Sequence, residues 1–214
     1  MTPAIDHLVV AARTLDEGVA WCETTLGVTP AGGGKHPLMG THNRVFSIAS
    51  ERHPKAYFEI IAIDPDAPPP GRPRWFDLDT PSMQATIAAG PQLIHWALGC
   101  DDIVERCARL RAAGIERGEV LHATRGTLSW RISVRPDGAR LFDGRLPTLI
   151  QWDGPHPVDS LPASGVTLRD VECAGLPAAA VQALDAPALF VPQGHHLQVH
   201  LSTPRGDIAL RSSP

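Results

Sequence analysis

Ile5-Asp6-His7-Leu8-Val9-Val10-Ala11, near the beginning of the 214-residue chain, is the stretch that decides the fold. It predicts a β-strand buried on both faces, because apolar residues occupy both sides of the two-residue alternation. The pattern returns as Leu93-Ile94-His95-Trp96-Ala97-Leu98, in which His95 follows His7 by 88 positions. A strand with an internal histidine that occurs twice indicates two copies of one structural unit.

The segments behind these two strands share a helical pattern. The same shift of 88 positions places Leu15 on Ile103 and Val19 on Cys107, and in each copy the pair keeps the four-residue spacing of one apolar helix face. Two units of this kind suggest half-domains that share one sheet system, with a site where they meet.

Strands, helices and proline-rich breaks divide the chain into four segments. We predict a first module over 1–65, a linker with a short helix over 66–91, a second module over 92–153 and a partial third module over 154–214. In each of the first two modules a strand is followed by a helix and then by further strands. The glycine-rich run 31–37 is expected to be a flexible loop. The third module is expected to complete the sheet or cover an edge.

Composition narrows the class of protein. A net charge of −4 argues against nucleic acid as a partner, because phosphate binding needs a clustered basic surface. No apolar run is long enough for a membrane span, and the beginning of the chain lacks a basic signal-peptide region. The four scattered cysteines are expected to be reduced core thiols of a cytoplasmic protein. No dinucleotide or phosphate-loop fingerprint is present, so no nucleotide cofactor is expected.

Four polar side chains lie inside strands that should be buried, and they form the candidate site: His7, Glu59, His95 and Gln151. Glu59 stands out because its neighbours are apolar, and a buried carboxylate costs several kcal/mol unless a cation or strong donors meet it. Imidazole nitrogens with a carboxylate oxygen suit zinc, iron, manganese or nickel.

Two further runs complete a family resemblance: Gly40-Thr41-His42-Asn43-Arg44 and Tyr57-Phe58-Glu59-Ile60-Ile61-Ala62-Ile63-Asp64-Pro65. Together with the repeated histidine strands, they make residues 4–152 resemble the vicinal oxygen chelate superfamily, and within it the glyoxalase-like, bleomycin-resistance-like group. The resemblance implies an α+β fold in which paired βαβββ modules form a curled, cup-shaped mixed sheet with helices outside. It also implies a possible homodimer.

The resemblance places metal ligands on the first and last strands of each module. Carried over, His7, Glu59 and His95 are the expected ligands of a divalent Zn, Ni, Mn or Fe ion, with Gln151 nearby. The ion would act as a Lewis acid, and Glu59 is the candidate catalytic base. Gln151 departs from the glutamate that metal-dependent relatives often carry, and an amide cannot act as a base. Gln151 is therefore assigned to a substrate oxygen or a water.

Other residues are expected to bind substrate. In the arrangement that the resemblance implies, Asn43 and Arg44 lie on a strand beside the proposed site. Arg44 can bind a carboxylate through two hydrogen bonds. His36 is expected to close over the mouth of the cup. Trp96 and Trp130 are assigned to its apolar wall, although core packing is an alternative for both.

Two functions of different classes remain open. The first is a glyoxalase-like enzyme, a lyase or isomerase, that acts on a small oxygenated molecule with adjacent carbonyl, hydroxyl or carboxylate groups. The second is a metal-free protein that sequesters a small molecule. Dioxygenase chemistry ranks third, because it usually needs a carboxylate where this chain has Gln151. A purely structural alternative pairs His7 with Asp6, and Glu59 with Arg44 or Arg131.

Overall fold

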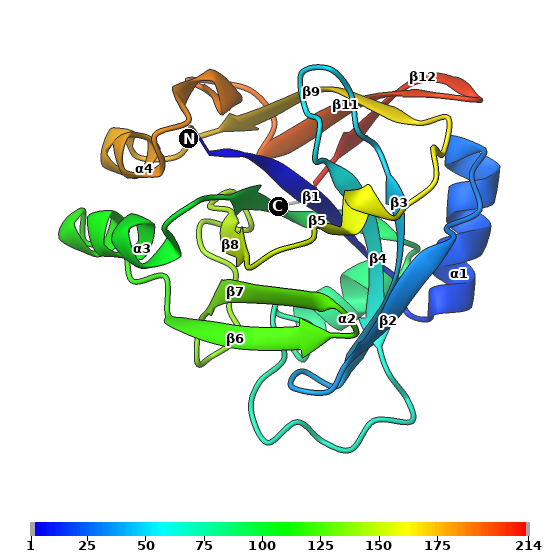
Figure 1. The fold of residues 1–214 in the computed structure, drawn as a ribbon, viewed down its shortest axis with the longest axis horizontal. Helices are drawn as coiled ribbons and strands as arrows, with labels where there is room; N and C mark the ends of the chain where they lie inside the picture. Colours follow the sequence, from blue (N-terminus) through cyan, green and yellow to red (C-terminus); the bar gives the residue numbers. More distant parts are fainter. Residues whose placement is uncertain (1–2, 213–214) are drawn as a thin grey trace.

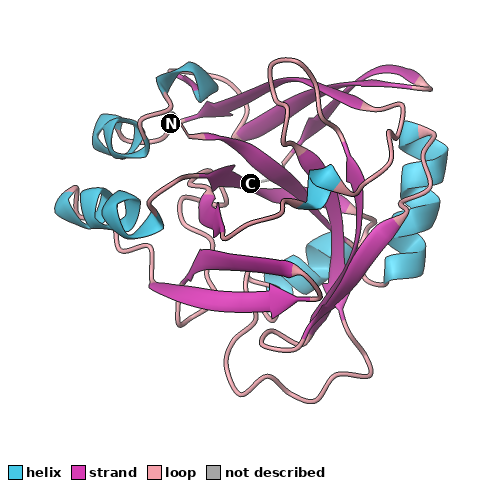
Figure 2. Ribbon diagram, in the orientation of Figure 1, coloured by secondary structure: helices cyan, strands magenta, loops and turns pink. Residues whose placement is uncertain are grey.

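An eight-stranded curled sheet, built from two copies of one βαβββ unit, forms the body of the protein (Figures 1 and 2). The computed structural model describes residues 3–212. The first unit contains β1 (Ala4–Ala11), α1 (Leu15–Trp21) with a π-helical turn over Cys22–Leu26, β2 (Gly32–His36), β3 (Thr41–Ser47) and β4 (Tyr57–Ile63). The second contains β5 (Gln92–Gly99), α3 (Ile103–Ala112), β6 (Glu119–Arg125), β7 (Leu128–Val134) and β8 (Thr148–Trp152). Helix α2 (Pro81–Ala88) lies between them.

The order of the strands confirms the predicted duplication. It runs β2-β3-β4-β1-β5-β8-β7-β6, so the two units have the same internal order and meet at β1 and β5. In each unit the first strand pairs in parallel with the last, and β1 pairs antiparallel with β5. The histidine strands are therefore the two central strands of the cup.

Local signals explain where the helices begin. Thr14 and Asp102 cap α1 and α3, because their side-chain oxygens accept hydrogen bonds from the backbone N–H groups of Glu17 and Glu105, at 3.2 and 2.9 Å. The helical segment that begins with α1 ends at Gly27, whose φ of 73° is the left-handed conformation that glycine adopts without a steric penalty.

Two apolar clusters occupy the two faces of the sheet. Leu8, Val10 and Phe58 belong to the outer cluster, beneath the helices. Val9 and Ile61 belong to the inner cluster, on the concave side. Because side chains alternate along a strand, His7 and Glu59 lie on the same side as Val9 and Ile61. Burial on both faces agrees with the nearly continuous apolar composition of the central strands.

The glycine-rich run is a strand, so the expectation of a flexible loop was wrong. β2 pairs antiparallel with β3 over its whole length. Glycine is depleted in strands, and the run therefore resembles a loop in sequence. Here glycine is needed for space: a Cβ on Gly33 would lie 2.1 Å from the Asn43 carbonyl oxygen, and one on Gly34 would lie 2.7 Å from Cδ of Arg125. The missing side chains let β6 approach β2 across the open side of the cup (Figure 1).

The C-terminal segment forms a separate four-stranded sheet of order β10-β9-β11-β12. It contains a 3-10 turn (Pro157–Asp159), β9 (Thr167–Ala174), α4 (Ala178–Leu184), a second turn (Pro187–Leu189), β10 (Phe190–Val191), β11 (Leu197–Thr203) and β12 (Gly206–Arg211). This order differs from that of the two modules, in which the first strand pairs with the last. Leu168 and Val199 of this sheet belong to the outer cluster, so it packs on the outside of the cup.

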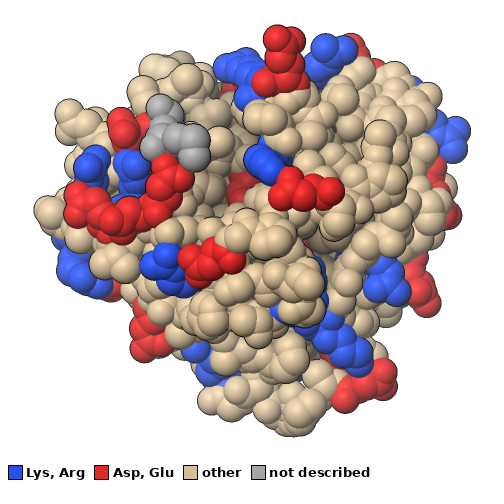
Figure 3. Space-filling view, in the orientation of Figure 1, with Lys and Arg blue, Asp and Glu red and all other residues tan. Residues whose placement is uncertain are grey.

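The cysteines lie mostly in the core. All four cysteines are free, and Cys22, Cys107 and Cys173 are buried. Within residues 3–212 no helix has the length and apolar character needed to cross a membrane. Basic and acidic side chains are intermixed on the face shown in Figure 3.

Candidate functional site

His7 lies on the concave face of β1 in a chain of buried polar contacts. Its Nδ1 is 2.7 Å from Oδ1 of Asp6, and Oδ2 of Asp6 accepts hydrogen bonds from Nε1 of Trp152 at 2.8 Å and from His156 at 3.1 Å. Since a carboxylate only accepts, the Nδ1 atom carries the proton and Nε2 faces the cavity. Tyr57 stacks on the ring, with centroids 4.7 Å apart.

Charge around His7 favours its protonated form. Burial by itself lowers the pKa of His7, but the hydrogen bond and charge of Asp6 and the charge of Glu59 outweigh it, so the pKa lies above the ordinary value. Burial opposes ionisation of Asp6 as well. The hydrogen bonds and charges of His156 and His7 nevertheless bring the pKa of Asp6 down to about 2. Asp6 therefore holds the orientation of the imidazole and stabilises an imidazolium.

Glu59 faces His7 from the neighbouring strand β4. Its Oε2 is 3.7 Å from Nε2 of His7, and its Oε1 accepts a hydrogen bond of 2.6 Å from Nδ2 of Asn43. Asn43 is held in this orientation because its Oδ1 accepts from the backbone N–H of Gly34 at 2.9 Å and from Arg125 at 3.2 Å. One carboxylate oxygen of Glu59 is thus bound by an amide, and the other is directed at the imidazole.

These groups surround a small inner cavity of about 30 Å³, with room for a few atoms. Its polar wall is made by His7, His36, Asn43, Tyr57, Glu59 and Arg125, and the rest is mainly aromatic or aliphatic. His36 contacts the edge of Trp75, and burial lowers the pKa of His36 to about 4, with Arg125 acting in the same direction and Glu59 against it. A neutral His36 can accept a hydrogen bond through Nε2.

A larger outer cavity of about 250 Å³ adjoins the inner one. His36, Trp75, Trp130 and Ile132 line both, so they form the passage between the two spaces. Most of the outer wall is apolar and includes Leu38 and Met39. Its volume is near the lower end of the range for small-molecule sites.

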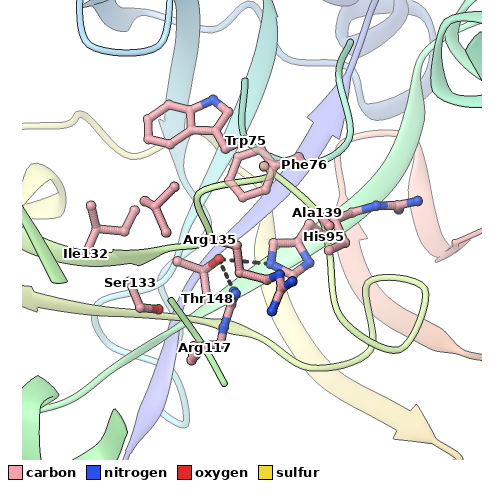
Figure 4. Close-up of a pocket in the computed structure, with 12 residues that line it drawn as sticks. Trp75, Phe76, His95, Arg117, Ile132, Ser133, Arg135, Ala139 and Thr148 are labelled. Carbon is pink, nitrogen blue, oxygen red and sulfur yellow. Dashed lines mark hydrogen bonds between the residues drawn. The ribbon is translucent and has the colours of Figure 1, made fainter. Parts of the chain in front are cut away.

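His95 does not share the cavity of His7 and Glu59. Its Nδ1 is 3.1 Å from the carbonyl oxygen of Gly144, and its Nε2 is 3.0 Å from Oγ1 of Thr148. Because a carbonyl only accepts, Nδ1 carries the proton and Nε2 accepts from the hydroxyl. The ring faces a different small cavity, shown in Figure 4, and Phe76 lines both this cavity and the inner one. Both nitrogens of His95 are already engaged.

Gln151 lies on the outer face of β8, away from the cup. Its Oε1 accepts a hydrogen bond of 2.9 Å from the backbone N–H of Ile103 at the beginning of α3. The sheet register identifies the true counterpart of Glu59. Val9 pairs with Glu59, and Ala97, which follows Val9 by 88 residues, pairs with Thr148. Thr148 and Gln151 are three residues apart, so they point to opposite faces of the strand.

Two other predicted residues lie outside the cavities. Arg44 is exposed, and its Nη1 donates to the carbonyl oxygen of Asn43 at 3.3 Å. Trp96 is fully buried in the outer cluster and donates to the carbonyl oxygen of Arg145, which is the core-packing alternative. The alternative partners proposed for Glu59 do not pair with it either, since Arg131 binds Asp153 at 3.0 Å.

The pairing of His7 with Asp6, which the sequence offered as the structural alternative, is present in the structure. Sequence reasoning missed the positions of Thr148 and Arg125. Asp6 had a detectable signal, since it is an acidic residue inside an apolar strand beside the histidine. Thr148 has no signal in the sequence, because its place is known only from the pairing of β8 with β5. Arg125 meets Asn43 and His36 from 82 and 89 positions away, so no local pattern indicates it.

The predicted three-ligand metal set does not assemble in the structure. His7 and Glu59 supply two donors, while His95 uses both ring nitrogens for other bonds. Among residues 3–212 no group of three or more His, Cys, Asp or Glu side chains is placed to hold a metal ion. Arg125 adds a positive charge to the same cavity. The residues present therefore do not fit the expected divalent site, and no chemical step is assigned to a metal.

We expect calorimetric titration of untagged protein with Zn²⁺ or Ni²⁺ to show no tight one-to-one binding, because a catalytic metal usually needs three protein ligands. The variants His7→Gln and His95→Gln are the matched pair. Stoichiometric binding that both substitutions abolish would show that the two imidazoles do reach one ion.

Comparison with known proteins identifies relatives of this fold. The sequence matches the family described as glyoxalase-like domain over residues 5–188. A crystal structure of a hypothetical protein from Staphylococcus aureus is similar at 16% identity, covering 99% of this chain and 85% of that one, with a TM-score of 0.56.

Two further structures, both of methylmalonyl-CoA epimerase, also match. The Streptomyces coelicolor enzyme in complex with 2-nitronate-propionyl-CoA is 19% identical and covers 72% of this chain and 100% of its own, with a TM-score of 0.48. The Mycobacterium tuberculosis enzyme is 17% identical and covers 71% and 89%, with a TM-score of 0.42. None of the curated proteins compared with this chain matches it.

Proposed function

The chain belongs to the glyoxalase-like domain family, and from this premise we propose that it is an enzyme that moves a proton at a carbon beside a carbonyl group. The substrate is a small oxygenated molecule, and the reaction is an isomerisation or an elimination. The observation that carries the proposal is the facing pair of His7 and Glu59, 3.7 Å apart, at the wall of the inner cavity.

Glu59 is the base in this proposal. Asn43 occupies one carboxylate oxygen, which leaves Oε2 to accept a proton from carbon. His7 is the acid, because the environment that raises its pKa favours an imidazolium whose Nε2–H can donate to a developing enolate oxygen. The proton that leaves carbon thus goes to Glu59, and His7 balances the charge on oxygen.

Two hydrogen-bond donors, Trp75 and Arg125, favour a substrate with several oxygen atoms. The indole N–H of Trp75 is buried, lines both cavities and has no hydrogen-bond partner among the residues that the structure describes. A buried donor without a partner is unusual, and a ligand oxygen would satisfy it. Arg125 forms no ion pair within residues 3–212 and lines the inner cavity, which favours a substrate that carries a carboxylate. The apolar outer cavity takes the body of the molecule.

The proposal is tested by proton exchange in D₂O. Small α-hydroxy ketones, α-keto acids and acyl thioesters are incubated with the protein, and ¹H NMR follows loss of the signal from the carbon beside the carbonyl. We expect protein-dependent exchange with at least one class, and faster exchange when the compound carries a carboxylate. Exchange equal to the protein-free rate for every class would refute the proposal.

The competing function is sequestration of a small aromatic molecule without turnover. It is favoured by the tryptophans at the passage, since Trp75 and Trp130 line both cavities and offer faces for stacking. Binding that quenches tryptophan fluorescence, without exchange or conversion of the ligand, would select this function.

A further inference from the structure

The second module contains a buried positive charge that lacks a counter-ion. Arg117 is 3% exposed, and no carboxylate within residues 3–212 lies within ion-pair distance of it. Its Nε donates to the carbonyl oxygen of Pro147 at 2.9 Å, and its Nη2 donates to Oγ1 of Thr148 at 2.5 Å. Both partners are neutral. Burying an unpaired guanidinium is costly, so an anion at this position would offset a large penalty.

Arg117 borders a cavity of about 10 Å³, which is the size of one water-sized sphere. Arg135 and Arg140 also line it, and each already binds an aspartate, Asp137 and Asp77 respectively. The excess positive charge in this cavity is therefore that of Arg117. Figure 4 shows Arg117 and His95 reaching the Thr148 hydroxyl from two directions, beneath the rings of Trp75 and Phe76.

The backbone at the cavity roof is held in an unusual conformation. Phe76 and Asp77 have φ values of 61° and 60°, in the left-handed region that non-glycine residues rarely adopt. Arg140 fixes Asp77 through a 2.8 Å ion pair, and Asp77 donates its N–H to the carbonyl oxygen of Gly138. This arrangement fixes the position of Phe76, which lines both the arginine-lined cavity and the inner one.

Equivalent positions in the two modules carry different polar groups. His95 is the counterpart of His7, and Thr148 is the counterpart of Glu59 by sheet register. Where the first copy has a carboxylate, the second has a hydroxyl that accepts from a guanidinium. Burial, together with the charges of Arg117 and Arg140, brings the pKa of His95 well below its ordinary value, whereas the pKa of His7 is raised.

We propose that the cavity between Arg117, His95 and Phe76 is a binding site for a single-atom monovalent anion, a halide such as chloride. The anion accepts hydrogen bonds from the guanidinium of Arg117, whose Nη1 donates to no described residue. The size of the cavity excludes phosphate and carboxylates. This site is independent of the acid–base function proposed for Glu59.

Thermal unfolding of the wild-type protein at constant ionic strength tests the proposal. Sodium gluconate, which is too large for the cavity, is replaced stepwise by sodium chloride, bromide or formate. We expect a saturable rise in Tm with the halides, of about 5 °C or more at a hundredfold excess over Kd, because the anion binds the folded state only. A rise with chloride or bromide supports the halide site. A rise with formate alone would overturn it, because formate has three non-hydrogen atoms and is larger than the cavity. No saturable rise with any of them would also overturn the proposal.

Two variants test whether the rise in Tm depends on Arg117. Arg117→Met should abolish the saturable rise, whereas Arg111→Gln, at an exposed arginine paired with Glu116, should retain it. A rise that persists in Arg117→Met would place the anion elsewhere and overturn the proposal. If Arg117→Met does not fold, crystals of the wild-type protein soaked in bromide decide the question. Anomalous scattering should then place bromide beside the Arg117 guanidinium, and bromide bound only at other positions would overturn the assignment.

Discussion

Glu59→Gln should slow proton exchange at the carbon beside the substrate carbonyl by about 10²- to 10⁴-fold, the usual contribution of a positioned base. A glutamine cannot take up the proton, yet its Oε1 can still accept the hydrogen bond from Asn43. The protein should therefore remain folded, with a Tm equal to that of the wild type or higher, because one buried charge is removed. Exchange followed by NMR and thermal unfolding measure the two effects.

A second readout does not depend on the identity of the substrate. The negative charge of Glu59 is one of the causes that raise the pKa of His7, so Glu59→Gln should lower that pKa in an NMR titration. Glu51→Gln, at an exposed loop residue, is the matched control and should change neither property. Unfolding of Glu59→Gln would show that the residue is structural. Full exchange activity in the folded variant would show that it is not the base.

Acidification should destabilise the protein strongly between pH 6.5 and pH 4. His36 has its pKa lowered from 6.5 to about 4, so over this range the unfolded chain binds a proton that the folded protein excludes. Stability is then complete above pH 6.5, and the loss reaches about 3 kcal/mol as the pH falls to 4. The pKa of His95 is also lowered, which adds a loss of the same sign.

Other buried groups act in different pH ranges. The pKa of His7 is raised, so its contribution to stability is complete below pH 6.5 and is lost as the pH rises through the folded-state value. The pKa of Asp6 falls from 3.8 to about 2, so its contribution is lost only below pH 3.8. The decline between pH 6.5 and 4 therefore belongs to His36 and His95, together with His42 and His53, whose pKa values burial also lowers.

Urea unfolding at several pH values in this range measures the effect. His36→Gln removes one of these titrations and should reduce the decline by about 3 kcal/mol across the range. Ile132→Val is the control, because loss of one methylene from the core lowers stability at every pH without changing the slope. A decline as steep in His36→Gln as in the wild type would mean that His36 does not carry the effect.

The fold followed from the sequence because its signals are local or periodic. The shift of 88 residues between His7 and His95 is confirmed as a true duplication by the strand order. Thr14 and Asp102 are the caps of the helices behind the two histidine strands. The run 31–37 was mistaken for a loop, since glycine has little intrinsic preference for strands. Its pairing with β3 is a long-range property that composition does not reveal.

The sequence alone determined the repeated unit and the placement of His7 and Glu59 inside buried strands, since apolar periodicity and an isolated buried charge are visible in one dimension. Only the tertiary structure decided that Thr148, and not Gln151, occupies the position in the second module that is equivalent to Glu59 in the first. The reason is that β8, like β1, has apolar residues on both faces. The alternation of residues therefore does not predict which side chains of β8 point to the concave face. That depends on how β8 pairs with β5 and curls with the whole sheet.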